Sequence, residues 1–99
     1  MQLGDYFGQC SAVSSAVTGS TNSSVLLYSN DSRLKVCFYN HSTAAMFLKL
    51  GDGATVTSFT VKLGSGSYYE TPLPIHTASI TATWDAAAGS VYITELGIK

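Results

Sequence analysis

Apolar and polar residues alternate along much of this chain, most clearly between residues 33 and 63. Leu34, Val36 and Phe38 alternate there with the side chains of a second face. This is the period-two pattern of a strand whose two faces meet different surroundings. Two further apolar runs follow, and short polar segments of turn-forming residues separate the three runs. We therefore predict a β-meander with strands at 34–39, 46–50 and 59–63, whose turns at 40–43 and 51–54 meet solvent or neighbouring molecules.

The flanking segments have the same character. Ile80, Ala82 and Trp84 share one face of a further run, with threonines on the other. Pro72 and Pro74 cannot donate to a ladder, so their segment is expected at an edge or in a loop. The other strands are expected at 10–17, as an irregular edge strand, and at 25–28, 68–71, 78–84 and 91–96.

Eight short strands at close spacing, with no convincing helix, predict an all-β fold. We expect a single β-sandwich or jelly roll of about eight short antiparallel strands. The 99 residues fit one domain. We divide the chain into a short N-terminal arm, residues 1–9, and a β-sandwich domain, residues 10–99.

Composition changes the picture from fold to surface. Charged residues make up 11% of the chain and the formal net charge is −1, against about 25% charged residues in an ordinary domain. The surface must therefore be rich in Ser and Thr hydroxyls and weakly charged, and low net charge promotes association. We expect other subunits to cover part of it. The alternative is a soluble monomer with a polar, uncharged coat.

Charge and hydropathy argue against nucleic-acid and membrane partners. Phosphate binding needs clustered cations, and no apolar run approaches the roughly 20 residues of a membrane-spanning helix. The chain start lacks a basic end followed by an apolar block, so we expect no export through the general secretory route. We predict no nucleic-acid and no membrane partner. The five cations are scattered: Arg33, Lys35, Lys49, Lys62 and Lys99.

Candidate chemistry is sparse. Cys10 and Cys37 are expected to be free thiols in a reducing compartment, with a disulfide between them as the alternative. His41 and His76 form no recognised metal-ligand interval with either cysteine, and no serine sits in a Gly-x-Ser-x-Gly elbow. We predict no metal site, no cofactor and no enzyme activity.

Two groups of aromatic residues are candidates for binding. Tyr6 and Phe7 in the arm can dock on a neighbouring subunit as assembly contacts, or pack on their own domain. A second group can form a sugar-binding surface, because aromatic faces stack on sugar rings while a carboxylate accepts hydrogen bonds from hydroxyls. In the alternative, Trp84 is a core residue and Tyr69 a strand partner. The candidate glycan contacts are Tyr68, Tyr69, Glu70 and Trp84.

Several short motifs follow one another between about Ser11 and Gly97. They are the Asn-x-Ser-Thr turn at 40–43, the apolar-Lys-apolar-Gly strand at 48–51, a Thr-Val-Lys strand, Gly-x-Tyr-Tyr-Glu at 66–70, Trp84 at a strand end, and Thr-Glu-Leu at 94–96. Their order resembles a small β-domain of virion proteins in tailed bacteriophages. His41 and Cys37 depart from the pattern, which expects more neutral side chains there.

The resemblance implies a structural part of a virion, assembled in the bacterial host cytoplasm. We expect a stand-alone capsid decoration or cement protein that forms a homotrimer and bridges copies of the major capsid protein. Such a protein works through multivalent contacts and oligomer symmetry. The alternatives are a tail fibre or spike module with receptor or glycan binding, and a head-to-tail component.

Overall fold

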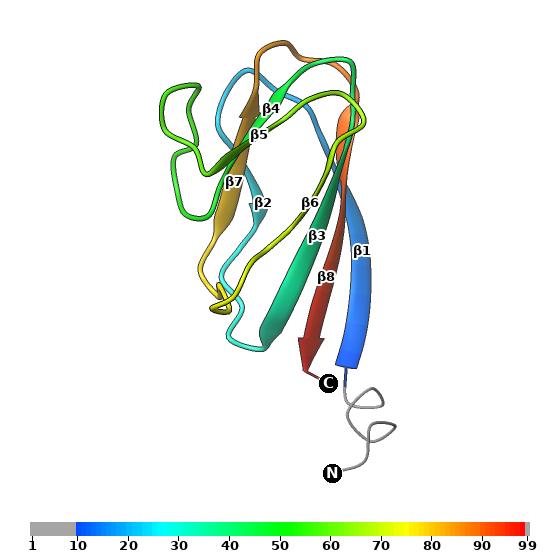
Figure 1. The fold of residues 1–99 in the computed structure, drawn as a ribbon, viewed down its shortest axis with the longest axis vertical. Coiled ribbons are helices and arrows are strands. Elements are labelled where there is room, and N and C mark those ends of the chain that lie inside the picture. The colour runs from blue at the N-terminus through cyan, green and yellow to red at the C-terminus, as the bar shows by residue number, and fades with distance from the viewer. Residues whose placement is uncertain (1–9, 99) are drawn as a thin grey trace.

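The computed structural model describes residues 10–98, which form two four-stranded antiparallel sheets packed face to face. Figure 1 shows the two sheets as separate layers. The prediction of an all-β sandwich is confirmed, and no helix occurs in the part of the chain that the structure describes. Sheet A has the order β1-β8-β3-β6 and sheet B the order β2-β7-β4-β5. The strands are β1 (Cys10–Thr18), β2 (Ser24–Leu27), β3 (Arg33–His41), β4 (Met46–Lys49), β5 (Val61–Leu63), β6 (Tyr68–Glu70), β7 (Ile80–Trp84) and β8 (Ser90–Ile98).

The core lies between the sheets and follows from the period-two pattern. Val36 and Phe38 of β3 point inward beside Val91 and Ile93 of β8, and all four are buried. Trp84 closes β7 and is the largest fully buried side chain. Facing residues of sheet B complete one continuous cluster, which includes Leu26, Met46, Leu48, Leu63, Ile80 and Ala82.

The central stretch is not a meander, although its strands form close to the predicted positions. β3 belongs to sheet A, whereas β4 and β5 pair with each other in sheet B. The chain therefore crosses from one sheet to the other between His41 and Met46. A turn signal reports that the chain reverses, but it does not report on which sheet the next strand lies.

The crossing turn is held by a buried amide and does not simply face solvent as predicted. Asn40 is fully buried, and its Nδ2 donates to the carbonyl oxygens of Ala44 and Leu63, each at 2.9 Å. Its Oδ1 accepts from the Ser42 hydroxyl at 2.7 Å. In the second predicted turn Ala54 is also buried. Each turn therefore exposes only part of its residues. In the first turn the backbone supplies the acceptors that the buried Asn40 amide needs.

Two other strands differ from the prediction in detail. β1 is an edge strand as expected, but it pairs with β8 in an unbroken register from Cys10 to Thr18 and is not irregular. β7 is buried on both faces. Loops cover its outer face, where Thr81 donates to the Gly51 carbonyl at 2.7 Å and Thr83 donates to that of Thr21 at 3.0 Å. Loops that cover the outer face of a strand leave no trace in its own alternation.

Candidate functional site

The structure separates the residues that the sequence analysis grouped for glycan binding. Tyr68 and Glu70 are exposed on the outward face of β6, whereas Tyr69 is half-buried and packs against the core. Trp84 is 1% exposed, so it cannot stack on a sugar at the surface. The alternative is confirmed, with Trp84 as a core residue and Tyr69 as a strand partner of Phe38. Tyr6 and Phe7, the candidate assembly contacts, lie outside the described residues.

A small hydrogen-bonded group surrounds Glu70. The Tyr68 hydroxyl donates to Glu70 Oε1 at 2.7 Å, and Lys35 Nζ lies 3.1 Å from Glu70 Oε2. These two partners lower the pKa of the Glu70 carboxyl. Side-chain hydrogen bonding with Cys37 and Glu70 raises the pKa of Tyr68, and burial raises that of Tyr69. Glu70 is therefore an ionised acceptor, and Tyr68 is a neutral donor.

The four sheet edges are unequal. β5 and β6 are three residues long, and β2 has four residues with a register shift between Val25 and Leu27. Shortness and bulges are the usual protection of an edge against pairing with another chain. β1 has nine residues in unbroken register, without a charged residue or proline. It lies at the outer margin of sheet A in Figure 1.

The register shows which backbone groups β1 leaves free. Gly19 N donates to the Gly89 carbonyl at 3.0 Å, directly after the last pair of the ladder. Because donors alternate along an antiparallel strand, the odd-numbered residues of β1 bond to β8. The even-numbered residues direct their amides outward, where no strand of the range 10–98 pairs with them. These outward residues, from Ala12 on, are Ala12, Ser14, Ala16 and Thr18.

Most side chains of β1 are also exposed to solvent. Val13 shares a face with Glu95 in the register and is 59% exposed. An uncharged, long edge strand with little cover is a template for another strand. We call this element, the outer edge of residues 10–18, the β1 edge.

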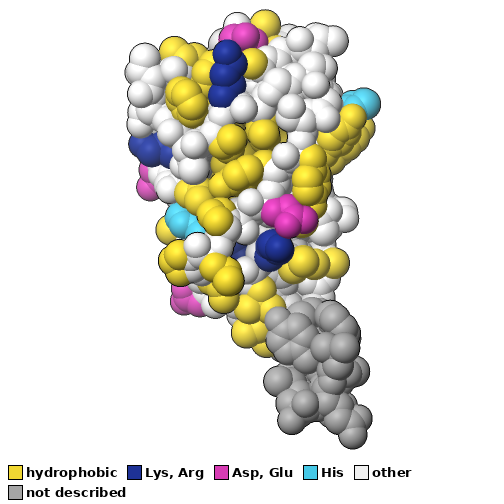
Figure 2. All heavy atoms as spheres, in the orientation of Figure 1, with side chains coloured by type: hydrophobic (Ala, Val, Ile, Leu, Met, Phe, Trp, Pro, Cys, Tyr) yellow, Lys and Arg dark blue, Asp and Glu magenta, His cyan; other side chains and the backbone are white. Residues whose placement is uncertain are grey.

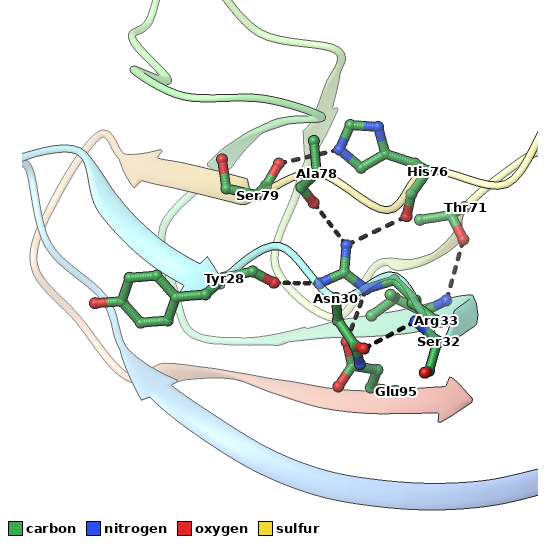
Figure 3. Close-up of polar contacts among 10 residues, drawn as sticks. Tyr28, Asn30, Ser32, Arg33, Thr71, His76, Ala78, Ser79 and Glu95 are labelled. Carbon is green, nitrogen blue, oxygen red and sulfur yellow. Dashed lines mark hydrogen bonds and ion pairs between the residues drawn. The ribbon is translucent and has the colours of Figure 1, made fainter. Parts of the chain in front are cut away.

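A buried arginine joins the loops at the start of β3. Arg33 is 1% exposed, and its Nε donates to Glu95 Oε2 at 2.7 Å. Its two Nη atoms donate to the carbonyl oxygens of Tyr28, Ala78 and His76, at 2.6, 2.7 and 3.2 Å. Figure 3 shows the guanidinium surrounded by these acceptors from three segments of the chain. The arrangement fixes loop positions and leaves no open face for a ligand.

The sequence analysis missed this role because it counted Arg33 only as one scattered cation. Strict alternation from Val36 back along the strand puts Leu34 on the core face. The ladder between β3 and β8 has a register shift between Arg33 and Lys35, and this bulge turns Arg33 inward. A bulge of this kind has no reliable sequence signal.

The two cysteines cannot form a bond within one chain. Cys10 is opposite Ile98 on one side of β8, and Cys37 is opposite Thr94 on the other. Four residues along a strand span about 13 Å, well beyond the roughly 7 Å between Cα atoms that a disulfide permits. Cys37 is a free thiol of intermediate exposure.

The described residues contain little that could hold a metal or act as a catalyst. Within residues 10–98 no three side chains of His, Cys, Asp or Glu converge. His76 Nε2 lies 3.0 Å from the Ser79 carbonyl oxygen, while His41 is exposed on sheet A. Across residues 10–98 there is no helix that is long and apolar enough to cross a membrane.

Comparison with known proteins adds one finding. No protein-family model and no curated protein matches the chain. A solved structure of Bacillus endospore appendages, described as a novel family of disulfide-linked pili, has a similar fold. The TM-score is 0.57 at 15% identity, with 90% of this chain and 86% of that chain covered. At this identity the likeness concerns the fold alone.

Proposed function

We propose that the chain is a structural subunit of a bacteriophage particle, of the capsid decoration or cement type. The observation that supports an assembly role is the β1 edge. Three of the four sheet edges are short or bulged, whereas β1 presents outward amides over nine residues. Monomeric proteins usually protect such an edge against pairing with another chain, so an unprotected edge supports a role in contacts between chains.

The surface supports the same role. Figure 2 shows a few charged side chains, with basic and acidic ones lying side by side, and wide uncharged areas between them on the face that it presents. Charge does little to keep copies of such a molecule apart, and a subunit that joins a lattice loses little solvation of charged groups on contact. Multivalent binding by a symmetric oligomer then converts weak single contacts into stable occupancy. In this proposal the partners are further copies of the chain, as a homotrimer, and the major capsid protein.

Pairing at the β1 edge is tested by changing one outward amide. Ser14→Pro removes an outward N–H while leaving the bonds between β1 and β8 in place, because proline is tolerated at the free side of an edge strand. Ser14→Thr is the matched control, which keeps the amide. Sedimentation velocity is expected to show an oligomer for the wild type and Ser14→Thr and a monomer for Ser14→Pro. An unchanged oligomer in Ser14→Pro contradicts the edge as the contact.

The place of the subunit in a particle needs a separate measurement. Cryo-electron microscopy of virions that carry the chain is expected to show its density on the outer surface of the capsid, at symmetric positions between capsid subunits. Density confined to the tail or the head-to-tail junction contradicts the decoration role. Rings larger than trimers in solution would favour the junction. A gene next to that of the major capsid protein is the cheapest supporting observation.

A second candidate is a subunit of a covalently linked filament. It is favoured by the fold likeness to the disulfide-linked pili and by the partly exposed Cys37, which cannot bond to Cys10 of its own chain. Bonds between Cys10 of one copy and Cys37 of the next would produce a ladder of bands on a non-reducing gel. The ladder should vanish in Cys37→Ser and after reduction. A single monomer band under oxidising conditions rejects this candidate.

A further inference from the structure

One row of the outward face of sheet A consists of aromatic side chains. The register places Tyr92 of β8 beside Tyr39 of β3, and Tyr39 beside Tyr68 of β6. They are 48%, 38% and 57% exposed, respectively. The His41 ring stacks on Tyr92, with centroids 5.0 Å apart and planes 19° apart. Tyr39, Tyr68, Tyr92 and His41 form what we call the tyrosine platform.

The sheet holds the platform rings in a defined arrangement. The Tyr39 centroid lies 6.4 Å from that of Tyr92 and 5.9 Å from that of His41. The fourth position in the row is Ala16 of β1, whose small side chain leaves the β1 side of Tyr92 uncovered. Each ring has two rotatable bonds on a rigid strand, so ordering it against a ligand costs little conformational entropy. None of the three tyrosines belongs to the core cluster, and their common exposed face suggests a ligand.

A recess of about 420 Å³ adjoins the platform at the end of β3. Tyr39 and His41 line both the platform and the recess, so the two form one surface. The remaining lining comes from Asn40 of β3 and from turns, with the hydroxyl side chains of Thr43 and Ser65 among them and no Lys, Arg, Asp or Glu. Its volume is within the roughly 300–1,000 Å³ of small-molecule sites. Neutral donors and acceptors in such a recess match a neutral polar ligand.

Charge decides among the ligands that bind to aromatic faces. Single-stranded nucleic acid also stacks on such rings, but it needs a basic groove along its phosphates. The cation that the structure places nearest in the register, Lys35, is already paired with Glu70. Glu70 in turn accepts from Tyr68 and keeps further acceptor capacity toward a ligand hydroxyl. The platform therefore complements an uncharged molecule rich in hydroxyl groups.

We propose that the tyrosine platform and its recess bind a neutral carbohydrate chain. The ring faces stack on the apolar C–H faces of successive sugar units across β8, β3 and β6. The sugar hydroxyls exchange hydrogen bonds with Thr43, Ser65 and Glu70, and one end of the chain enters the recess. This site goes beyond the assembly role, because it uses the face of sheet A and leaves the β1 edge free.

The test is a titration of the ¹⁵N-labelled full chain with neutral hexasaccharides of glucose and of N-acetylglucosamine, followed by NMR. Saturable shifts are expected at Tyr39, His41 and Tyr92 with at least one of them. Tyr39→Thr and Tyr92→Thr, which keep strand propensity, should each lower affinity about tenfold, as loss of one stacked ring does. Tyr28→Thr is the matched control, since Tyr28 is an exposed tyrosine away from the platform, and its affinity should be unchanged.

Several results overturn the proposal. One is the absence of chemical-shift changes with either hexasaccharide at concentrations up to about 10 mM. Another is binding to heparin or polyuridylate without binding to either hexasaccharide. Equal losses of affinity in Tyr28→Thr and Tyr39→Thr would mean that the platform is not the site. A shift to monomers in both platform variants, measured by sedimentation, would show that the platform contacts a second copy. The near-ultraviolet circular dichroism of each variant establishes that it is folded.

Discussion

Replacing Arg33 by methionine is expected to destabilise the domain more than any other single change at a charged residue. The substitution keeps the volume of the aliphatic stem but removes a buried guanidinium. Glu95 loses its partner at 2.7 Å, and the carbonyl oxygens of Tyr28 and Ala78 lose donors at 2.6 and 2.7 Å. Breaking one side of a buried ion pair costs about 3–5 kcal/mol.

Two features adjust that magnitude. Glu95 is 17% exposed, so water can partly replace its lost partner. Each carbonyl that stays buried without a donor costs about 1–3 kcal/mol, and these costs do not add fully. We therefore expect a loss of about 3–5 kcal/mol in the free energy of unfolding, a large part of the roughly 5–15 kcal/mol of a typical domain.

The assay is urea unfolding followed by the fluorescence of Trp84, the single tryptophan of the chain. Lys35→Met is the matched control on the same strand, because the Lys35–Glu70 pair is 44% and 46% exposed and should contribute less than about 1 kcal/mol. If Arg33→Met costs no more than Lys35→Met, the guanidinium does not hold the loops together. That result would refute the reasoning.

Two further predictions concern a turn and a carboxyl group. Gly89→Ala should cost about 2–4 kcal/mol in urea unfolding, because a Cβ would lie 2.5 Å from the His41 carbonyl oxygen at a φ of +65°. Gly53→Ala, at φ +73° with open space, should cost only about 1–2 kcal/mol, and equal costs would refute the close contact. The pKa of Glu70 should be lowered in an NMR titration and rise toward its ordinary value in Tyr68→Phe. Its stabilising contribution is thus present above the unfolded pKa of a glutamate and lost as pH falls through the lowered folded pKa; an unchanged pKa in Tyr68→Phe contradicts the hydrogen bond.

The strand pattern could be predicted because it depends on local alternation. The core faces of β3 and β8 follow directly from the period-two spacing of Val36, Phe38, Val91 and Ile93. The assignment of strands to sheets could not be predicted, since the crossing after His41 depends on long-range hydrogen bonds. These are invisible in local sequence.

The candidate surfaces were predicted less well for a similar reason. Tyr68 and Glu70 were singled out by their nearness in sequence, and both lie on an exposed face. Tyr39 and Tyr92 lie in the same row only because β3 and β8 pair in one particular register. The β1 edge was foreseen as an edge strand, but its regularity and its free amides depend on the ladder with β8.

Amide hydrogen exchange of β1 tests the central claim most directly. The amides of Val13 and Ser15 point toward β8 and are bonded to it in the monomer, whereas those of Ser14 and Ala16 point away from β8, to the free edge. Dilute and concentrated samples of the wild-type chain should therefore differ only in the second set. The account predicts that the outward amides exchange freely in the monomer and become protected in the assembled state. Outward amides that exchange equally fast in both states would contradict it.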